Sequence, residues 1–262
     1  MSTQKSIPVV GTAVVNSNFW VTRLLMSIDY PVDNFVIINN NGRGELDDDL
    51  DNLKKINHKF VKNIKIVHLP ANIGVSGAWN LIIKCYMNSP YWIIANDDVS
   101  FGPGVLEEMS TKIENDSNLG LIHGNPGAFG VGSWDLFLIR DIIIQTFGLF
   151  DENLYPAYCE DADYIMRFIH RPIKKILSLE KPYYHGLEIS DGEYHYQTQK
   201  NDPSLKEKLD DVNAMNIEYL TTKWGTGWRL CSPTVEPFEN QEGNSYQSNY
   251  DLEFVRKKHL GF

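Results

Sequence analysis

Acidic and amide side chains follow directly after an apolar segment near residue 95. Asn96, Asp97 and Asp98 come after the run YWIIA and precede a turn. Burying two adjacent carboxylates is costly unless a cation or a hydrogen-bond donor lies beside them. Mg²⁺ and Mn²⁺ prefer oxygen ligands, and Mg²⁺ typically binds through one or two carboxylates plus substrate phosphates. The triplet is therefore either a metal site or an Asp-rich turn that caps the next helix.

A second acidic group is Glu160, Asp161 and Asp163, in the first turn of a predicted helix. The positive end of a helix dipole favours the ionised carboxylate there, and an ionised carboxylate beside a hydroxyl can act as a general base. The structural alternative is helix capping together with a pair between Asp163 and Arg167, four residues apart. His185 follows a candidate strand and could be a metal ligand, a base or an ordinary buried histidine.

The elements that must position these groups follow from the hydrophobic periodicity of the first hundred residues. Apolar runs typical of buried strands cover 7–15, 34–39, 64–69 and 91–95, and helical spacing lies between them at 21–28, 46–56 and 78–86, with Ser17 as a candidate N-cap. This alternation predicts βαβ units and a mostly parallel sheet. In such sheets, ligands bind beyond the carboxyl ends of the strands. The residues at those ends are Asn16, 39–42, 72–74 and 96–98.

The second half of the chain is less regular. Helical spacing covers 103–113, 141–147, 159–169 and 205–224, and a strand is expected at 134–139. Residues 120–134 are rich in glycine and predict short strands and loops, with 127–132 as a candidate mobile lid. The aromatic residues of this half either pack in the core or line an acceptor site; they are Trp134, Tyr155, Tyr158, Tyr183, Tyr184, Trp224 and Trp228.

Composition excludes several classes of protein. The 262 residues carry 24 Lys and Arg against 34 Asp and Glu, a net charge of −10, which argues against a protein that coats nucleic acid. Cys85, Cys159 and Cys231 are widely spaced and form no CxxC pair, so we expect core thiols in a reducing compartment rather than a zinc site or a disulfide framework. The N-terminal apolar run is too short to span a membrane. We therefore expect a soluble, cytoplasmic protein with neither a nucleic-acid partner nor a membrane span.

Seven segments, taken in order, resemble the inverting family 2 glycosyltransferases of the GT-A fold. They are PVVGTAVVN at 8–16, FVIINNNG at 35–42, NIGVSGAWN at 72–80, NDD at 96–98, FGLFDE at 147–152, EDAD at 160–163, and His185-Gly186 with Ser190. The resemblance covers about residues 7–190. It implies an α/β fold with a mostly parallel central sheet, helices on both faces and a small antiparallel sheet on the acceptor side.

The resemblance also implies a domain organisation and an activity. Residues 1–200 would form the glycosyltransferase domain, with a nucleotide-binding half at about 7–100 and an acceptor and catalytic half at about 101–200, and 201–262 would be a helix and polar tail packed on it. The enzyme would transfer a sugar from a nucleotide-diphosphate sugar, with UDP-sugars favoured, to a hydroxyl of a glycan or glycoconjugate. Inversion at the anomeric carbon would follow from a single displacement.

Residue by residue, the resemblance implies three sets of roles. The nucleotide-binding residues would be Thr12, Ala13, Asn40, Asn72, Gly74, Asn96 and Asp97. Asp98 would bind a divalent cation, Mn²⁺ or Mg²⁺, with His185 as a further metal ligand. The catalytic residues would be Asp161, as the base that deprotonates the acceptor, and Glu160 beside it.

Two positions depart from the family's pattern, and two other functions stay open. Asn40 stands where the family commonly has an Asp that reaches uracil, so the base could be uracil, thymine or guanine. Asn96 stands at the first position of the DxD motif, so metal binding would rest on Asp98 with help from Asp97 or His185. The alternatives are a non-catalytic glycan-binding protein and a sugar-1-phosphate nucleotidyltransferase, although GTAVVNSN lacks the Arg and Lys of the latter's glycine-rich loop.

Overall fold

The computed structural model describes residues 5–124, 134–170, 174–186, 188–189 and 203–227. The strands are β1 (Ile7–Val14), β2 (Val32–Asn39), β3 (Val61–His68), β4 (Tyr91–Ala95), β5 (Val99–Ser100), β6 (Leu119–His123), β7 (Leu136–Arg140), β8 (Lys175–Ser178), β9 (Tyr184–His185) and β10 (Glu188–Ile189). The helices are α1 (Asn18–Met26), α2 (Asp47–Leu53), α3 (Gly74–Cys85), α4 (Val105–Asn115), α5 (Asp141–Phe147), α6 (Glu160–His170) and α8 (Pro203–Trp224).

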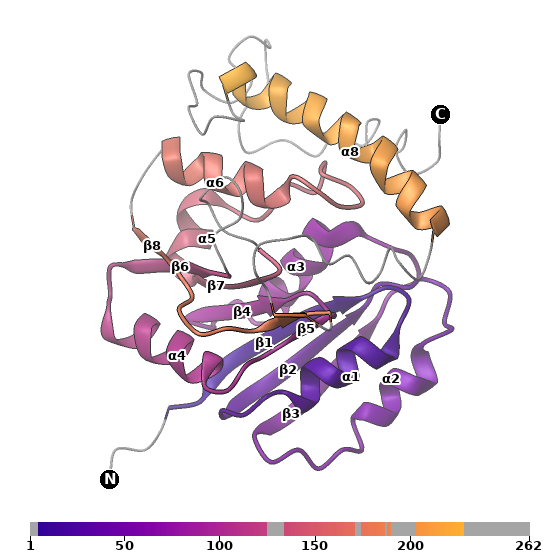
Figure 1. The fold of residues 1–262 in the computed structure, drawn as a ribbon, viewed down its shortest axis with the longest axis vertical. Helices are drawn as coiled ribbons and strands as arrows, with labels where there is room; N and C mark the ends of the chain where they lie inside the picture. The colour runs from indigo at the N-terminus through magenta and orange to yellow at the C-terminus, as the bar shows by residue number, and fades with distance from the viewer. Residues whose placement is uncertain (1–4, 125–133, 171–173, 187, 190–202, 228–262) are drawn as a thin grey trace.

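Seven of the strands form one mixed sheet in the order β3-β2-β1-β4-β7-β6-β8, and the other three form a small sheet in the order β10-β9-β5 (Figure 1). Strands β3, β2, β1 and β4 are parallel, and β8 is parallel to β6. β7 is antiparallel to both of its neighbours, and the small sheet is antiparallel throughout. The expected mostly parallel central sheet with a small antiparallel sheet is therefore confirmed.

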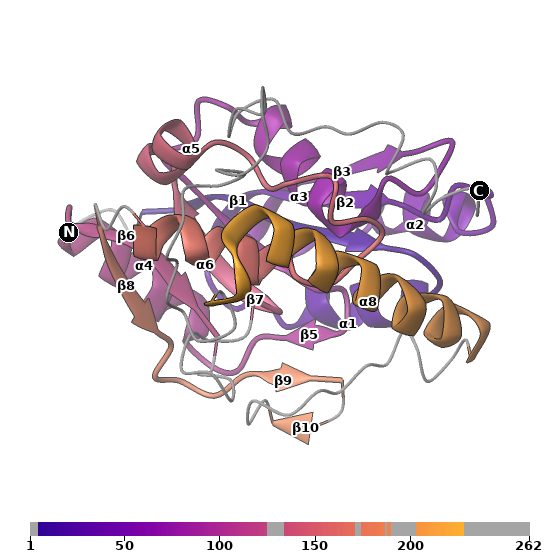
Figure 2. The same ribbon diagram turned by 90° about the horizontal axis from the view of Figure 1, so that it is seen from above.

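Helices cover both faces of the large sheet, and each face has its own hydrophobic core. One core packs α1, α2 and α4 against the sheet, with buried residues such as Leu24, Leu50 and Met109. The other packs α3, α5 and α6, with residues such as Ile82 and Tyr164. Figure 2 shows the sheet between these helices, with β9 and β10 beside β5 at the edge of the molecule.

Some local features differ from what the sequence predicts. Ser17 lies at the N-cap position of α1 with extended backbone, but its side chain makes no capping hydrogen bond. Cys85, the last residue of α3, is exposed, so the interpretation of it as a core thiol is wrong. Cys159 is half-buried and packs against the hydrophobic cluster of Leu154 and Met166. Cys231 and the candidate lid at 127–132 lie outside the described residues. No helix in the described ranges has the length and apolar character needed to cross a bilayer.

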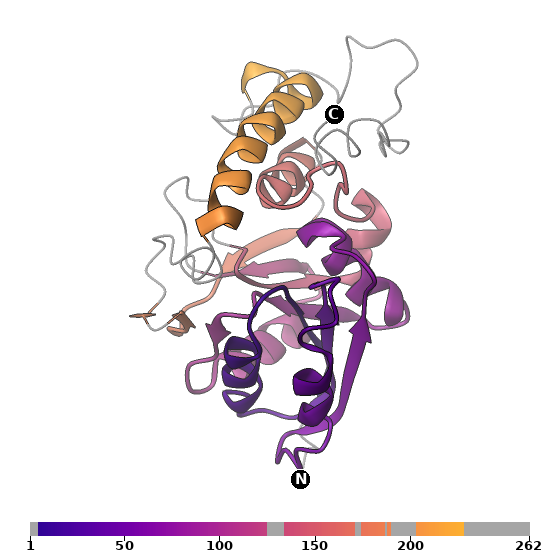
Figure 3. The ribbon, with the colours of Figure 1, turned by 90° about the vertical axis from the view of Figure 1, so that its right-hand side faces the viewer.

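The last described helix, α8, is joined to α6 by a buried ionic cluster. Figures 1 and 3 show the two helices side by side at the end of the molecule opposite β1 to β3. Lys223 on α8 contacts both Asp151 and Asp163, with its Nζ atom 2.7 Å from a carboxylate oxygen of each. Asp163 also accepts a hydrogen bond from the Trp224 indole and pairs with Arg167 at 2.5 Å. The pair between Asp163 and Arg167 that the sequence predicted is thus present.

This cluster fixes the protonation of Asp163. Burial alone would raise its pKa, but the charges of Arg167 and Lys223 outweigh burial and lower the pKa to about 2. Leu154, Met166, Leu220 and Trp224 form a buried hydrophobic cluster, and the Trp224 indole joins it to Asp163. The carboxylate is therefore a permanent anion that fixes α6, the helix that carries Glu160 and Asp161, against α8.

Replacing Lys223 by methionine removes the cation but keeps most of the side-chain volume. We expect the free energy of unfolding to fall by about 3–5 kcal/mol, because Asp151 and Asp163 are then left buried without this partner. Urea denaturation measures the change. Lys54→Met is the matched control, since Lys54 pairs with Asp51 at the exposed surface and should lose less than about 1 kcal/mol. Equal effects of the two substitutions would contradict the stabilising role of the cluster.

The same cluster predicts a pH dependence of stability. Because the pKa of Asp163 is about 2 in the folded protein, below the ordinary 3.8 of an aspartate, its contribution is complete above pH 3.8 and is lost as the pH falls through 2. We expect the free energy of unfolding to decrease less steeply over this pH interval in Lys223→Met than in the wild type, since Asp163 then binds its proton at higher pH. Parallel slopes in urea titrations at several pH values would show that Lys223 does not lower the pKa of Asp163.

Candidate active site

The predicted site residues gather at one edge of the large sheet, where the parallel strands β1, β2, β3 and β4 end. Asn40 follows β2, Asn72 lies between β3 and α3, and the triplet 96–98 lies between β4 and β5. His185 reaches the same edge because β9 pairs with β5, with His185 opposite Val99. Glu160 and Asp161 come from the first turn of α6. Segments far apart in the sequence therefore meet at this edge.

Asn40 holds the loop in front of α3. Its side chain is 2% exposed, its amide nitrogen donates to Asn72 Oδ1 (3.1 Å) and to the Gly74 carbonyl (3.2 Å), and its Oδ1 accepts from the Ile73 backbone N–H (2.8 Å). Gly74 has a φ of +77°, and a Cβ atom there would lie 2.9 Å from the Tyr155 ring. Glycine is therefore required at 74, and the amide of Asn40 is engaged with protein groups.

Thr12 and Ala13 lie on β1, and their side chains point to opposite faces because successive residues of a strand alternate. Thr12 is fully buried, and its hydroxyl has no hydrogen-bond partner among the described residues. Ala13 is partly exposed and packs with the α3 side of the sheet. Of these two neighbours, Ala13 is the more accessible to a ligand.

The acidic triplet is buried at the end of β4. Asp97 and Asp98 are 7% and 4% exposed. The Asn96 backbone N–H donates to the carbonyl of Asp135 (2.7 Å), and the Gly186 backbone N–H donates to the carbonyl of Asp98 (2.8 Å). Burial, followed by the negative charge of Asp98, raises the pKa of Asp97 well above its usual value. The pair of carboxylates is thus held close together in a poorly solvated place, where a cation stabilises it.

His185 lies between two of the carboxylates. Its Nε2 atom is 3.2 Å from Asp98 Oδ1, and its Nδ1 atom is 3.1 Å from Asp135 Oδ2. Burial disfavours the charged imidazolium, but the hydrogen bonds to Asp135 and Asp98 outweigh it and raise the pKa of His185 to about 10. The imidazole therefore carries a positive charge at neutral pH when no metal ion competes for Nε2.

The donor set at this place fits a divalent cation whose remaining ligands come from phosphate. In the part of the chain that the structure describes, no group of three or more His, Cys, Asp and Glu side chains is arranged to hold a metal ion. Asp98 and His185 supply two donors, and a cation that binds one or two protein side chains completes its shell with phosphate oxygens and water. Asp135 on the far nitrogen of the imidazole is the outer partner that metal-binding histidines usually have.

Glu160 and Asp161 open α6 at the other side of the site. Glu160 is 6% exposed and Asp161 is partly exposed, and Asp161 Oδ1 accepts from the Ala162 backbone N–H (2.7 Å). Burial, helped by the charge of Asp135, raises the pKa of Asp161. The backbone hydrogen bonds at the start of α6 favour the ionised carboxylate, as expected for a helix N-terminus, but desolvation outweighs them in the net shift.

The segment that leads into α6 is tied to α3 and α8. Asn80 on α3 donates to the Phe150 carbonyl and accepts from the Phe150 N–H (2.9 and 2.8 Å). Asn216 on α8 donates to the carbonyls of Ala157 and Tyr158 (2.8 and 3.0 Å). Tyr158 and Cys159 both have positive φ, which is uncommon for residues other than glycine. The start of α6 is thus held in one position by hydrogen bonds from two other helices.

Asp135 is the site residue that the sequence analysis missed. It is 4% exposed and precedes β7, whose Leu136 pairs with Ala95 at the end of β4. In a parallel sheet, candidate ligands at a strand terminus are the residues that follow strands. β7 is antiparallel to β4, so its beginning, and not its end, lies at the functional edge. The polar residue before the apolar run 136–139 is the signal that could have found it.

The aromatic candidates for an acceptor site divide by burial. Trp134, Tyr183 and Trp224 are no more than 3% exposed and belong to the hydrophobic cores. Tyr155 is 9% exposed and donates to the Asn72 carbonyl (3.3 Å), whereas Tyr184 is 37% exposed. Trp228 lies outside the described residues.

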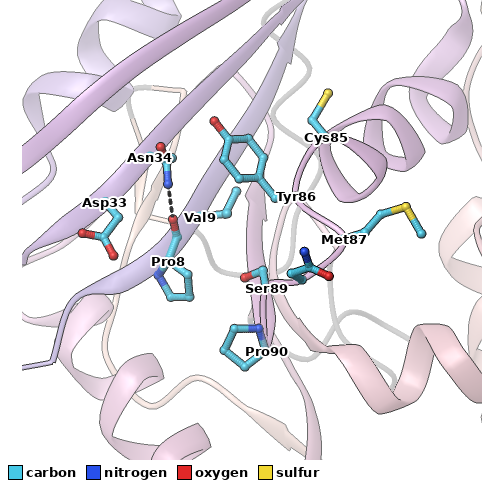
Figure 4. A pocket seen from close by; sticks show the side chains of 10 residues that line it. Pro8, Val9, Asp33, Asn34, Cys85, Tyr86, Met87, Ser89 and Pro90 are labelled. Carbon is cyan, nitrogen blue, oxygen red and sulfur yellow. Dashed lines mark hydrogen bonds between the residues drawn. The ribbon is translucent and has the colours of Figure 1, made fainter.

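A separate pocket of about 370 Å³ lies at the opposite ends of the strands. Figure 4 shows its lining, from the start of β1, the start of β2 and the segment between α3 and β4, with Asn34 donating to the Pro8 carbonyl. None of the predicted site residues lines it. It is therefore distinct from the edge where Asp98, His185 and Asp161 lie.

Comparison with known proteins places the chain in a family. The model described as "Glycosyl transferase family 2" matches residues 20–171, more than half of the chain. A "Galactofuranosyl glycosyltransferase" from Leishmania donovani is 24% identical over 291 aligned residues, which cover 83% of this chain and 67% of that protein.

Two solved structures show the same fold. The mannosyltransferase PcManGT from Pyrobaculum calidifontis, in complex with GDP-Man and Mn²⁺, aligns with a TM-score of 0.56 and 10% identity over 80% of this chain and 64% of that one. TarS 1–349 from S. aureus, in complex with UDP, aligns with a TM-score of 0.51 and 15% identity over 68% of this chain and 59% of that one. The chain thus spans less than two thirds of the length of either structure. Its mixed α/β architecture is the GT-A fold, and the chain belongs to glycosyl transferase family 2, a family of glycosyltransferases.

Proposed function

We propose that the protein transfers a sugar from a nucleotide-diphosphate sugar, UDP-sugars first among them, to a hydroxyl of a glycan or glycoconjugate, with a divalent cation as cofactor. The observation that carries the proposal is the set of contacts and charges around Asp135. His185, beside Asp98, contacts Asp135 directly, and the charge of Asp135 contributes to the raised pKa of Asp161. Both observations support a site in which Asp98 and His185 would hold the metal ion and Asp161 would act as the base.

The donor would bind at the ends of β1 to β4. Residues 7–100 would form the nucleotide-binding half, with contacts from Thr12, Ala13, Asn40, Asn72, Gly74, Asn96 and Asp97. Asp98 and His185 would hold Mn²⁺ or Mg²⁺, which when bound stabilises the negative charge of the departing diphosphate. Because the amide of Asn40 is engaged in the loop before α3, its role would be to shape the base pocket rather than to read the base through free amide atoms.

The acceptor would be activated by Asp161, within a catalytic half at about 101–200. The acceptor oxygen forms a bond to the anomeric carbon as the bond from that carbon to the diphosphate oxygen breaks. The proton of the hydroxyl passes to the Asp161 carboxylate, and the electron pair of the broken bond leaves with the diphosphate. A pKa raised by burial makes Asp161 a stronger base than an ordinary aspartate. Glu160, buried beside Asp161, would add a second carboxyl group to the pocket. A single displacement inverts the anomeric centre.

The relatives narrow the choice of donors for a first assay. The names and titles of the matched proteins mention galactofuranosyl, UDP and GDP-Man. A panel of UDP-galactofuranose, UDP-hexoses and GDP-mannose, each with Mn²⁺ or Mg²⁺, therefore covers the chemistry that the proposal allows. Residues 201–262 are proposed to belong to the same domain, with α8 supporting α6.

Asp98→Ala should abolish metal-linked nucleotide binding, because it removes an oxygen donor of the proposed cation. UDP with Mn²⁺ should raise the melting temperature of the wild type, since a ligand of the folded state stabilises it, and should leave that of the variant unchanged. Asp211→Ala, at an exposed position of α8, is the control and should behave like the wild type. A full nucleotide-dependent shift in Asp98→Ala would remove Asp98 from the metal site.

Asp161→Asn should leave nucleotide binding nearly intact and lower kcat by about 10²- to 10⁴-fold, because only the transition state uses the base. Asp141→Asn is the matched control. Asp141 also opens a helix, and its Oδ1 accepts from the next backbone N–H at 2.7 Å, as in Asp161, but it lies on α5 away from the site. If Asp161→Asn keeps wild-type turnover, the base is another residue.

A further inference from the structure

Asp135 contacts both the start of the acidic triplet and His185. Its backbone carbonyl accepts from the Asn96 N–H (2.7 Å), at the start of the acidic triplet. Its Oδ1 accepts from the Tyr183 hydroxyl (2.8 Å) and from the Leu136 backbone N–H (3.0 Å). Its Oδ2 lies 3.1 Å from His185 Nδ1. One oxygen is thus fixed by two protein donors, and the other faces the imidazole.

The surroundings of Asp135 are built to keep this arrangement. Tyr183 is fully buried, and a Cβ atom at Gly124 would lie 2.0 Å from the Tyr183 hydroxyl and 3.0 Å from Asp135 Oδ1. Residue 124 therefore has to be glycine for the tyrosine to reach the carboxylate. The carboxylate cannot turn away from His185 without losing both hydrogen bonds to Oδ1.

The orientation of His185 matters because its two nitrogens are not equivalent. An imidazole binds a metal ion through one nitrogen and keeps a proton on the other, and the hydrogen bond made by the second nitrogen decides which is which. Here Nδ1 faces Oδ2 of Asp135, whose other oxygen, Oδ1, accepts two hydrogen bonds. Nε2 faces Asp98, at the end of β4, where phosphates of a donor would lie.

We propose that Asp135 is a positioning residue that holds the proton of His185 on Nδ1 and directs Nε2 toward Asp98, where the two residues together bind the divalent cation. The proposal rests on the proposed function, since it assigns a role to Asp135 at the metal site suggested there. It adds a residue that acts through His185 and touches neither the cation nor the substrate.

The test is a double-mutant cycle on Mn²⁺ affinity of the full chain, read by electron paramagnetic resonance of free Mn²⁺ without any nucleotide. Asp135→Ala should weaken Mn²⁺ binding about 10- to 100-fold, as loss of an outer-shell partner usually does. Asp135→Asn keeps the shape and an acceptor oxygen, and should recover part of that loss. In a His185→Ala background, Asp135→Ala should cause no further loss, because a residue that acts through His185 has nothing left to orient.

Tyr183→Phe is the matched control, because it removes one hydrogen bond from the same carboxylate and leaves the contact with His185. It should change Mn²⁺ affinity much less than Asp135→Ala, and urea denaturation in EDTA should show that Asp135→Asn remains folded. If Asp135→Ala lowers Mn²⁺ affinity equally with and without His185, the proposed role of Asp135 is wrong. Wild-type Mn²⁺ affinity in both Asp135→Ala and Asp135→Asn would also overturn it. Neither result would contradict the metal-dependent function. A wild-type chain that binds no Mn²⁺ and gains no stability from UDP with Mn²⁺ would overturn the metal-dependent function together with this inference.

Discussion

The structure depends on how the negative charges of its buried carboxylates are balanced. Two groups of carboxylates are balanced in different ways. At the junction of α6 and α8, Asp151 and Asp163 face Lys223 and Arg167, so two anions meet two cations. At the end of β4, Asp98 and Asp135 share His185, and Asp97 lies beside them. Removing a charge from water costs several kcal/mol unless it is paired. Among the described side chains, the two anions of the first cluster are matched by two cations. The second cluster gains from an additional cation, which is why we place the cofactor there.

Three buried asparagines hold loops around the site. Asn40, Asn80 and Asn216 are each 2% exposed or less, and each fixes the backbone of a segment at least 33 residues away in sequence. A side-chain amide offers both donors and an acceptor, so it can satisfy a loop backbone without the cost of burying a charge. These amides therefore fix the loops without adding charge to the site. This also explains why the functional edge can be rigid and strongly acidic at the same time.

The strands, the helices and part of the candidate site could be predicted from the sequence. The residues that could not be predicted have identifiable physical reasons. Strands and helices followed from periodicity because their apolar residues are buried in the two cores on the two faces of the sheet. The residues after β2, β3 and β4 were found because parallel strands end at one edge. Asp135 was not found because β7 runs the other way, and strand direction is decided by pairing between segments far apart. Cys85 was misassigned because periodicity gives the face of a residue but not where the helix ends, and Cys85 is the last residue of α3.

Two aspartates on the same turn of α6 show why position in a helix does not decide function. Asp161 and Asp163 both lie in the first turn, where the helix dipole favours negative charge equally. Yet the pKa of Asp163 is lowered to about 2 and that of Asp161 is raised. The difference comes from their neighbours: Asp163 points to Arg167 and Lys223, whereas Asp161 is desolvated and feels the charge of Asp135. The cations hold one carboxylate permanently ionised as an anchor. Burial without such a partner makes the other a better proton acceptor, and the helix places it beside the proposed metal donors.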